Sequence, residues 1–248
     1  MCLSCIGLFL RKILRQSNSM KSMKRFAASA VLVFAVLSLV GCGSTGDKDP
    51  SKLGSVEKAQ TVTRLRKEAE ICLQQFVASE GDEDGIDIDA LLCYVEKLKT
   101  PTKIYPNPNL CSSCYAQYGE ALRMLGGYYR TLSLKQEESA TKADSERQAA
   151  LKKLSEENAQ KAERNYRLAL TQFNLHVASG QVLNWVYWKG FEVSARLDQY
   201  TMALKYLKLF EQNNTLDDAE KVKLTKWRKW TDDRIKKQLR DRVREELK

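Results

Sequence analysis

The chain has 248 residues and a net charge of +10, from 41 Lys and Arg residues against 31 Asp and Glu residues. Six of these cations and none of the acids precede Cys42, so the remainder of the chain carries only +4. Nucleic-acid-binding proteins carry a clustered basic face, and this small excess, interspersed with acids, argues against that class. The 207 residues from Cys42 to Lys248 are enough for one substantial core or two small ones.

The N-terminal region has the layout of a secretory signal. Lys24 and Arg25 precede fifteen mostly apolar residues, 26–40, which are followed by a small residue, Gly41. A basic end, a short apolar centre and a small-residue exit are the three parts of such a signal. The apolar stretch is shorter than the roughly 20 residues that cross a bilayer. We therefore expect residues 1–41 to act as a signal peptide and not as a transmembrane helix.

Residues 1–19 form an unusual extension ahead of this signal. They include two cysteines, Cys2 and Cys5, and three cations. We expect translation to begin at Met20 or Met23, and residues 1–19 to be an artefact of the gene model.

Leu39-Val40-Gly41-Cys42 resembles the lipobox of bacterial lipoprotein precursors. The resemblance implies that lipid is attached to the Cys42 thiol and that the chain is cut before this residue. Several acyl chains hold a protein firmly at a membrane, because each buried CH₂ contributes about 0.8 kcal/mol. Gly43 stands where an Asp retains enteric lipoproteins at the inner membrane. The resemblance thus implies an anchor facing the periplasm, at the outer membrane where two membranes exist, and no cofactor other than this covalent lipid.

Residues 42–55 are polar and rich in residues that break regular structure, so they predict a flexible tether between the lipid and the fold. Apolar residues then recur at helical spacing, which predicts a helix over residues 56–78. These residues are Val62, Leu65, Ala69, Cys72, Leu73 and Phe76.

A second helix follows an acidic loop. Asp87 or Asp89 is placed to cap its first turn, and the apolar pattern ends before Pro101. The two helices predict an N-terminal pair, 56–100. Because proline disfavours helix at its own position and at the one before it, residues 101–110 predict an extended, proline-rich linker.

The acidic loop is not predicted to bind calcium. Asp82, Asp84 and Gly85 resemble part of an EF-hand loop, but this register places Leu91 where a bidentate Glu is required. A solvated turn is the better interpretation, and we expect no metal site.

The region after the linker, residues 111–248, is expected to form one helical domain, and its residues 111–210 resemble tetratricopeptide repeats. In that family a small residue lies where two antiparallel helices cross, and an aromatic residue, a small residue and large apolar residues follow on the second helix. The resemblance implies that Gly190 and Ala203 let the backbones approach and that Tyr200 packs at the turn. The positions that keep the family intervals are Gly190, Val193, Leu197, Tyr200, Ala203, Leu207 and Phe210.

A partial earlier copy begins at Gly119 and reaches Tyr128, but Thr131 stands where its second helix needs a small residue. We therefore expect a degenerate repeat with a long, charged helical excursion over residues 133–160, for which a coiled arm is the alternative. An apolar stripe then returns. It comprises Leu151, Leu154, Ala162, Tyr166, Ala169 and Phe173.

The C-terminal segment, residues 216–247, places a few large apolar side chains among charged ones, including Trp227 and Trp230. A helical stack needs a polar outer face at its end, so this pattern predicts a capping helix. The fold class expected for the whole chain is all-α. It comprises antiparallel hairpins stacked in a tetratricopeptide-like arrangement, a long charged helix and the C-terminal cap.

Four cysteines follow Cys42, namely Cys72, Cys93, Cys111 and Cys114. The periplasm permits disulfides, so structural disulfides are the first interpretation, and three pairings are open. One pairing joins Cys72 to Cys93 and Cys111 to Cys114, and another bridges the N-terminal pair to the repeat region. The close pair Cys111-Ser-Ser-Cys114 also fits a redox pair at a helix start, whereas a zinc site is weak without a second close pair.

Aromatic residues crowd one helix of the better repeat, at Trp185, Tyr187, Trp188 and Phe191. Positions 185 and 187 lie nearly opposite each other on a helix, so these side chains do not share one buried stripe. Core packing is the first interpretation, and a groove that contacts a partner is the alternative.

Known catalytic signatures are absent from the sequence, including the nucleophile elbow, the phosphate loop and the zinc-protease helix. His176, the only histidine, lies near a predicted helix end and is interpreted as a partly buried or capping residue. We therefore expect a non-catalytic envelope lipoprotein that binds other envelope proteins as a scaffold or assembly adaptor. The alternative is a thiol–disulfide redox or redox-sensing lipoprotein that uses Cys111 and Cys114.

Overall fold

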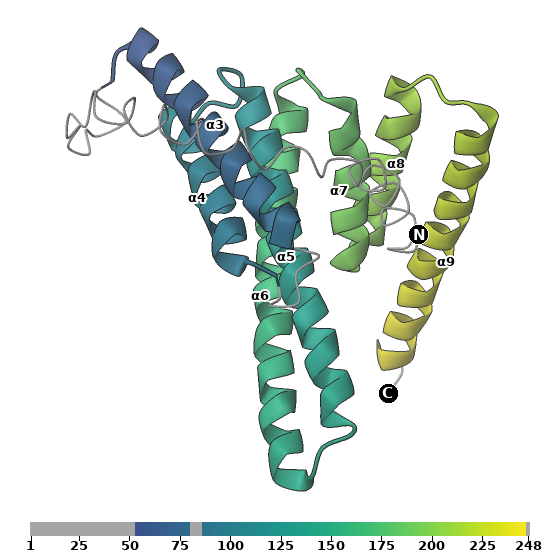
Figure 1. Cartoon of the computed structure of the whole chain (residues 1–248). Helices are drawn as coiled ribbons and strands as arrows, with labels where there is room; N and C mark the ends of the chain where they lie inside the picture. The colour runs from purple at the N-terminus through teal and green to yellow at the C-terminus, as the bar shows by residue number, and fades with distance from the viewer. Residues whose placement is uncertain (1–52, 80–85, 247–248) are drawn as a thin grey trace, which may run out of the picture. The chain divides into compact units, whose positions relative to one another are not determined.

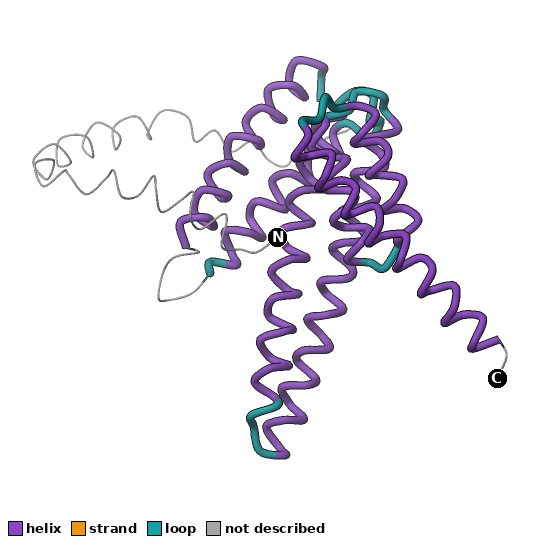
Figure 2. Tube along the Cα trace, turned by 90° about the vertical axis from the view of Figure 1, so that its right-hand side faces the viewer, coloured by secondary structure: helices purple, strands orange, loops and turns teal. Residues whose placement is uncertain are grey.

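A computed structural model describes residues 53–79 and 86–246. Within these ranges the protein is all-helical, as predicted, and no residue lies in a strand (Figure 1 and Figure 2). The predicted signal peptide, Cys42 and most of the tether lie outside the described residues. None of the described helices combines the length and the apolar character that a membrane crossing requires. The helices are α3 (Ser55–Ser79), α4 (Ile88–Ile104), α5 (Ser112–Ala140), α6 (Ser145–Ala178), α7 (Asn184–Arg196), α8 (Tyr200–Asn213) and α9 (Asp218–Glu246).

Helices α3 and α4 form the predicted N-terminal pair. Asp87 caps α4, because its carboxylate accepts a hydrogen bond of 3.0 Å from the Ala90 backbone N–H. The facing sides bury Phe76 and Leu91 against the first half of α5, where Leu125 completes the cluster. Burial of one apolar stripe from each helix thus holds the pair to the rest of the described chain.

The prediction that the second helix ends before Pro101 is wrong. Helix α4 continues through Pro101 to Ile104, and both of these residues are buried. The proline sits in the last turn, where only one intrahelical N–H is lost, and its own carbonyl still accepts the Tyr105 N–H at 3.0 Å. The linker is therefore shorter than the predicted 101–110, because burial of the last turn outweighs the local preference of proline.

Helix α5 is longer than the repeat pattern predicted. The repeat pattern implies a second helix that begins near Tyr128, but no turn forms there, and the chain continues as one helix to Ala140 before it returns as α6. The buried backbone of Gly119 packs against the ring of Phe173, and Gly126 packs against Tyr166. The partner of this segment is therefore α6, and not a second short helix.

The charged segment 133–160 is the far end of the α5–α6 hairpin, which turns at residues 141–144. In both views this end extends past the neighbouring helices (Figure 1 and Figure 2). The contact between α5 and α6 in this part is polar. The Ser155 hydroxyl donates to the Ser133 carbonyl at 2.9 Å, and the Asn158 amide donates to the Gln136 side chain at 2.9 Å. Leu154, predicted in the apolar stripe, is instead 46% exposed.

Helices α7 and α8 form the hairpin expected from the better repeat. Gly190 lies against the buried ring of Tyr206, and Ala203 is fully buried. At the turn, Asp198 adopts a positive φ of 56°, and its carboxylate accepts a hydrogen bond of 2.6 Å from the Tyr200 hydroxyl. The close helix contact therefore depends on the missing side chain of Gly190.

Helix α9 covers α8, in agreement with the predicted capping helix. Trp227 packs edge-on to Phe191, with ring centroids 5.5 Å apart, and Trp230 packs in the same way against Tyr200 at 5.6 Å. Only Leu224 and Thr231 of this helix are fully buried, and Arg228 forms an ion pair with Glu211 of α8. Most of α9 is thus exposed to solvent, and the helix contacts α7 and α8 through a narrow row of aromatic side chains.

Gly190→Ala is expected to destabilise the protein by about 1–3 kcal/mol, because the added methyl group would lie 2.2 Å from the fixed Tyr206 ring. Gly127→Ala on α5 is the matched control, since its nearest atom would be 3.9 Å away and a helical Gly-to-Ala change stabilises by roughly 0.5–1 kcal/mol. Urea denaturation of both variants measures the two changes. Equal effects would show that the close contact at Gly190 does not control stability.

Candidate functional site

The close cysteine pair lies at the start of α5. Cys111 is the N-cap residue and is partly exposed, whereas Cys114, in the first turn, is only 1% exposed. The two sulfurs are at disulfide distance, with the Cα atoms 5.4 Å apart. Cys72 on α3 and Cys93 on α4 form a second pair at disulfide distance, with a Cα separation of 5.9 Å.

Arg66 on α3 reaches both sulfurs of the close pair. Its Nη2 atom lies 3.3 Å from the Sγ atoms of Cys111 and Cys114 and donates a hydrogen bond of 2.7 Å to the Ser113 hydroxyl. Burial lowers the pKa of this guanidinium from its ordinary value, which is high enough for the charge to remain. Sequence reasoning missed Arg66, because no spacing rule links positions 45 residues apart. Its only signal was its place directly after the buried Leu65.

This arrangement gives the cysteine pair a specific chemistry. The N-terminus of α5 carries a partial positive charge, and the Arg66 guanidinium adds a full one beside both sulfurs. Both charges stabilise a thiolate over a thiol when the pair is reduced. The unequal exposure of the sulfurs leaves Cys111 as the one that a second molecule can reach.

His176, predicted as a partly buried or capping residue, is completely buried next to this pair. Its Nδ1 atom lies 2.9 Å from the Ser112 carbonyl oxygen and 2.6 Å from the Ser112 hydroxyl, and the Leu183 N–H donates to Nε2 at 2.9 Å. Because Nε2 accepts, Nδ1 carries the proton of a neutral ring. Both ring nitrogens are held by backbone groups, so the ring fastens the end of α6 to the start of α5.

The four candidate partner-binding aromatics do not share one surface. Tyr187 and Phe191 are 5% and 2% exposed and belong to the main core, so they are not available to a partner in this structure. Trp188 is partly buried and packs against Phe210 and Trp227. Only Trp185, which is 38% exposed, presents a large apolar surface. Core packing, the first interpretation, therefore describes Tyr187 and Phe191, and of the four candidates Trp185 is the one left open to a partner.

Metal ligands do not converge in the part of the chain that the structure describes. No group of three or more His, Cys, Asp or Glu side chains is placed there to hold an ion. Most of the acidic loop, residues 80–85, lies outside the described residues.

Comparison with known proteins gives no relative for this chain. No family model matches the sequence, no curated protein matches it, and no solved structure matches the fold.

His176 is expected to make the protein less stable in mild acid. Burial lowers its pKa, so below about pH 6.5 the unfolded chain takes up a proton that the folded chain refuses. The contribution of neutral His176 to the free energy of unfolding is therefore fully present above this pH. It falls with decreasing pH, by at most about 1.4 kcal/mol per pH unit, until the pKa of the folded state is reached.

Urea denaturation between pH 7.5 and 5 measures this dependence. His176→Gln should be less stable at neutral pH but should lose this component of the acid slope, since the sequence has no other histidine. An unchanged slope in the variant would assign the acid sensitivity to other groups.

Proposed function

We propose that this protein is a lipid-anchored scaffold of the bacterial cell envelope, which binds other envelope proteins and performs no catalysis itself. The observation that carries the proposal is the α7–α8 hairpin. The resemblance to tetratricopeptide repeats implies a close approach at Gly190 and an aromatic residue at the turn, and the support for it is that Gly190 packs against Tyr206 and that Tyr200 bonds to Asp198 at the turn. Repeats of that type stack helix pairs and present extended surfaces to other proteins.

The proposed anchor is lipid on Cys42, after cleavage of the signal peptide. The support is the match of residues 39–42 to a lipobox behind a basic and apolar leader. Residues 42–55 would then tether the fold to the membrane surface. In a two-membrane organism Gly43 favours the outer membrane, with the helices facing the periplasm.

Trp185 is the residue most suited to contact a partner. It lies in the first turn of α7, packs edge-on to Phe173 at 6.4 Å and still exposes 38% of its surface. A tryptophan held by its neighbours and open on one side loses little entropy on binding, which is why this residue type is common at binding hot spots.

The proposed function is tested in cells with the tagged full chain carrying a photo-reactive residue in place of Trp185. We expect the chain to fractionate with membranes and to yield one dominant cross-linked envelope protein. The reason is that a lipid on Cys42 would confine the chain to the membrane, and position 185 would lie at the contact.

Two controls test whether capture is specific to position 185 and whether membrane association depends on Cys42. The same photo-reactive residue at Leu239, which is 53% exposed on α9, should not capture that protein. Cys42→Ser should leave the membrane fraction and fail to incorporate labelled palmitate. Equal capture from both positions would contradict the scaffold, and membrane retention of Cys42→Ser would contradict the anchor.

A second candidate function is thiol–disulfide exchange by Cys111 and Cys114, which the position of Arg66 favours. A thiolate of a partner protein would attack Cys111 Sγ, and Cys114 would leave as a thiolate beside Arg66. A second thiolate of the same partner protein would then attack the partner's sulfur atom in the mixed disulfide and release the Cys111 thiolate. The partner would be oxidised to a disulfide, and the pair would accept two electrons.

Arg66→Gln is expected to make the Cys111–Cys114 pair harder to reduce, because the variant lacks the cation that stabilises the reduced thiolate. A tenfold change in the equilibrium corresponds to a potential lower by about 30 mV. Titration of the full chain against glutathione buffers measures it, with Arg64→Gln, an exposed arginine on the same helix, as the matched control. A wild-type potential far below that of thioredoxin, about −270 mV, would identify an inert structural disulfide.

A further inference from the structure

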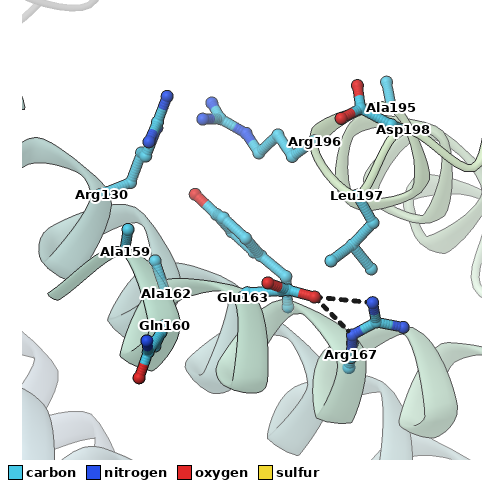
Figure 3. Close-up of a pocket in the computed structure, with 11 residues that line it drawn as sticks. Arg130, Ala159, Gln160, Ala162, Glu163, Arg167, Ala195, Arg196, Leu197 and Asp198 are labelled. Carbon is cyan, nitrogen blue, oxygen red and sulfur yellow. Dashed lines mark hydrogen bonds and ion pairs between the residues drawn. The ribbon is translucent and has the colours of Figure 1, made fainter. Parts of the chain in front are cut away.

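A polar pocket of about 690 Å³ lies where the α5–α6 hairpin passes the end of α7. Its walls come from α5, from the middle of α6, and from the end of α7 with the turn that follows it (Figure 3). Three arginines line it, Arg130, Arg167 and Arg196, together with two acids, Glu163 and Asp198. This volume lies in the range of pockets that hold small molecules.

The two acids are already engaged. Glu163 accepts hydrogen bonds of 2.6 and 2.9 Å from Arg167, and Asp198 accepts the Tyr200 hydroxyl at 2.6 Å. Arg130 and Arg196 form no ion pair with any described residue. Figure 3 shows these two side chains reaching toward each other across the pocket, away from the Glu163–Arg167 pair. Two guanidinium groups that converge without an acid between them leave a region of positive potential.

Tyr166 supplies a second, independent observation. It lines the same pocket and is only 4% exposed, and its hydroxyl makes no hydrogen bond of good geometry with any described group, although the Arg196 guanidinium lies near enough to act on it as a donor. The Arg196 guanidinium lies over its ring, 5.6 Å from the centroid. Burial raises the pKa of Tyr166, and the positive charges of Arg196, Arg123 and Arg130, together with a hydrogen-bonding effect of Arg196, oppose this rise. A buried hydroxyl without a partner is costly, and most are paired in folded proteins.

We propose that Arg130, Arg196 and Tyr166 form a binding site for an oxyanion group, either a carboxylate or a phosphate. Such a group accepts several hydrogen bonds, and arginine presents its donors in a fork that matches two oxygens of one group. The neutral tyrosine hydroxyl would donate to a further oxygen. A cation is disfavoured by the same charges, and an apolar ligand would leave the arginines desolvated and unpaired.

The Glu163–Arg167 pair fits this assignment. Glu163 neutralises the charge of Arg167 on the α6 wall, so the other two arginines of the pocket are the ones without an acid among the described residues. The site is distinct from Trp185 and from the cysteine pair, so it stands whether or not either proposed function is correct.

The site is tested with the full chain purified in mild detergent. Citrate, inorganic phosphate and the peptide Glu-Glu-Glu are titrated separately by calorimetry at constant ionic strength. We expect one-to-one binding of at least one small anion, and about a tenfold loss of affinity for each arginine removed in Arg130→Gln/Arg196→Gln. Tyr166→Phe should weaken binding without lowering thermal stability, because the ring still packs and the unpaired hydroxyl is gone.

Arg164→Gln is the matched control, since this arginine is exposed on α6 but does not line the pocket. Its affinity should equal that of the unaltered protein. Binding of citrate or phosphate would identify a free anion as the source of the group, and binding of the peptide alone would assign the source to an acidic protein segment. Failure of all three probes, or equal binding by the double variant, would overturn the proposal.

Discussion

The close packing of α5 against α6 is the constraint on which the rest of the fold depends. Gly119 and Gly126 have no side chains, so the rings of Phe173 and Tyr166 lie directly against the α5 backbone. A methyl group at either glycine would lie within 2.8 Å of a ring atom. Every other described helix attaches to this hairpin or to a helix already attached to it. The α3–α4 pair packs on α5, the α7–α8 hairpin packs on α6, and α9 closes the far side of α8.

The same packing also positions the polar groups that could take part in chemistry or in binding. His176, at the end of α6, meets Ser112 at the start of α5, and the neighbouring Cys111 is held at the helix N-terminus with Arg66 beside it. One helical pair thus fixes the buried histidine and the cysteine pair at one end. Further along, the contact at Gly126 buries the Tyr166 ring, and among the described residues its hydroxyl has no well-placed hydrogen-bond partner beside two arginines that form no ion pair.

Aromatic contacts, not a smooth apolar face, hold the C-terminal helix. Helix α9 is strongly charged, and it binds to the stack through Trp227 and Trp230, which contact rings on α7 and α8. Edge-to-face pairs of this kind contribute about 0.5–1.5 kcal/mol each beyond the area that they bury. Trp188 and Phe191 supply the α7 side of these contacts, because both rings pack against Trp227. Trp185 is left as the exposed aromatic residue of α7.

The sequence by itself determined the helical class, a cap for α4 at either Asp87 or Asp89, and the C-terminal capping helix, because periodicity and caps act over a few positions. The α7–α8 hairpin was implied by the resemblance to tetratricopeptide repeats, and only the structure selected Asp87 as the cap. Only the tertiary structure decided that α4 continues through Pro101 and that α5 runs on past Tyr128. In both cases, burial against distant helices outweighed a local preference. Relations between distant positions, such as the contact of Arg66 with the cysteines or the placement of Arg130 and Arg196 around one pocket, depend on which helices meet. No local pattern encodes that choice, since it results from how whole faces pack together.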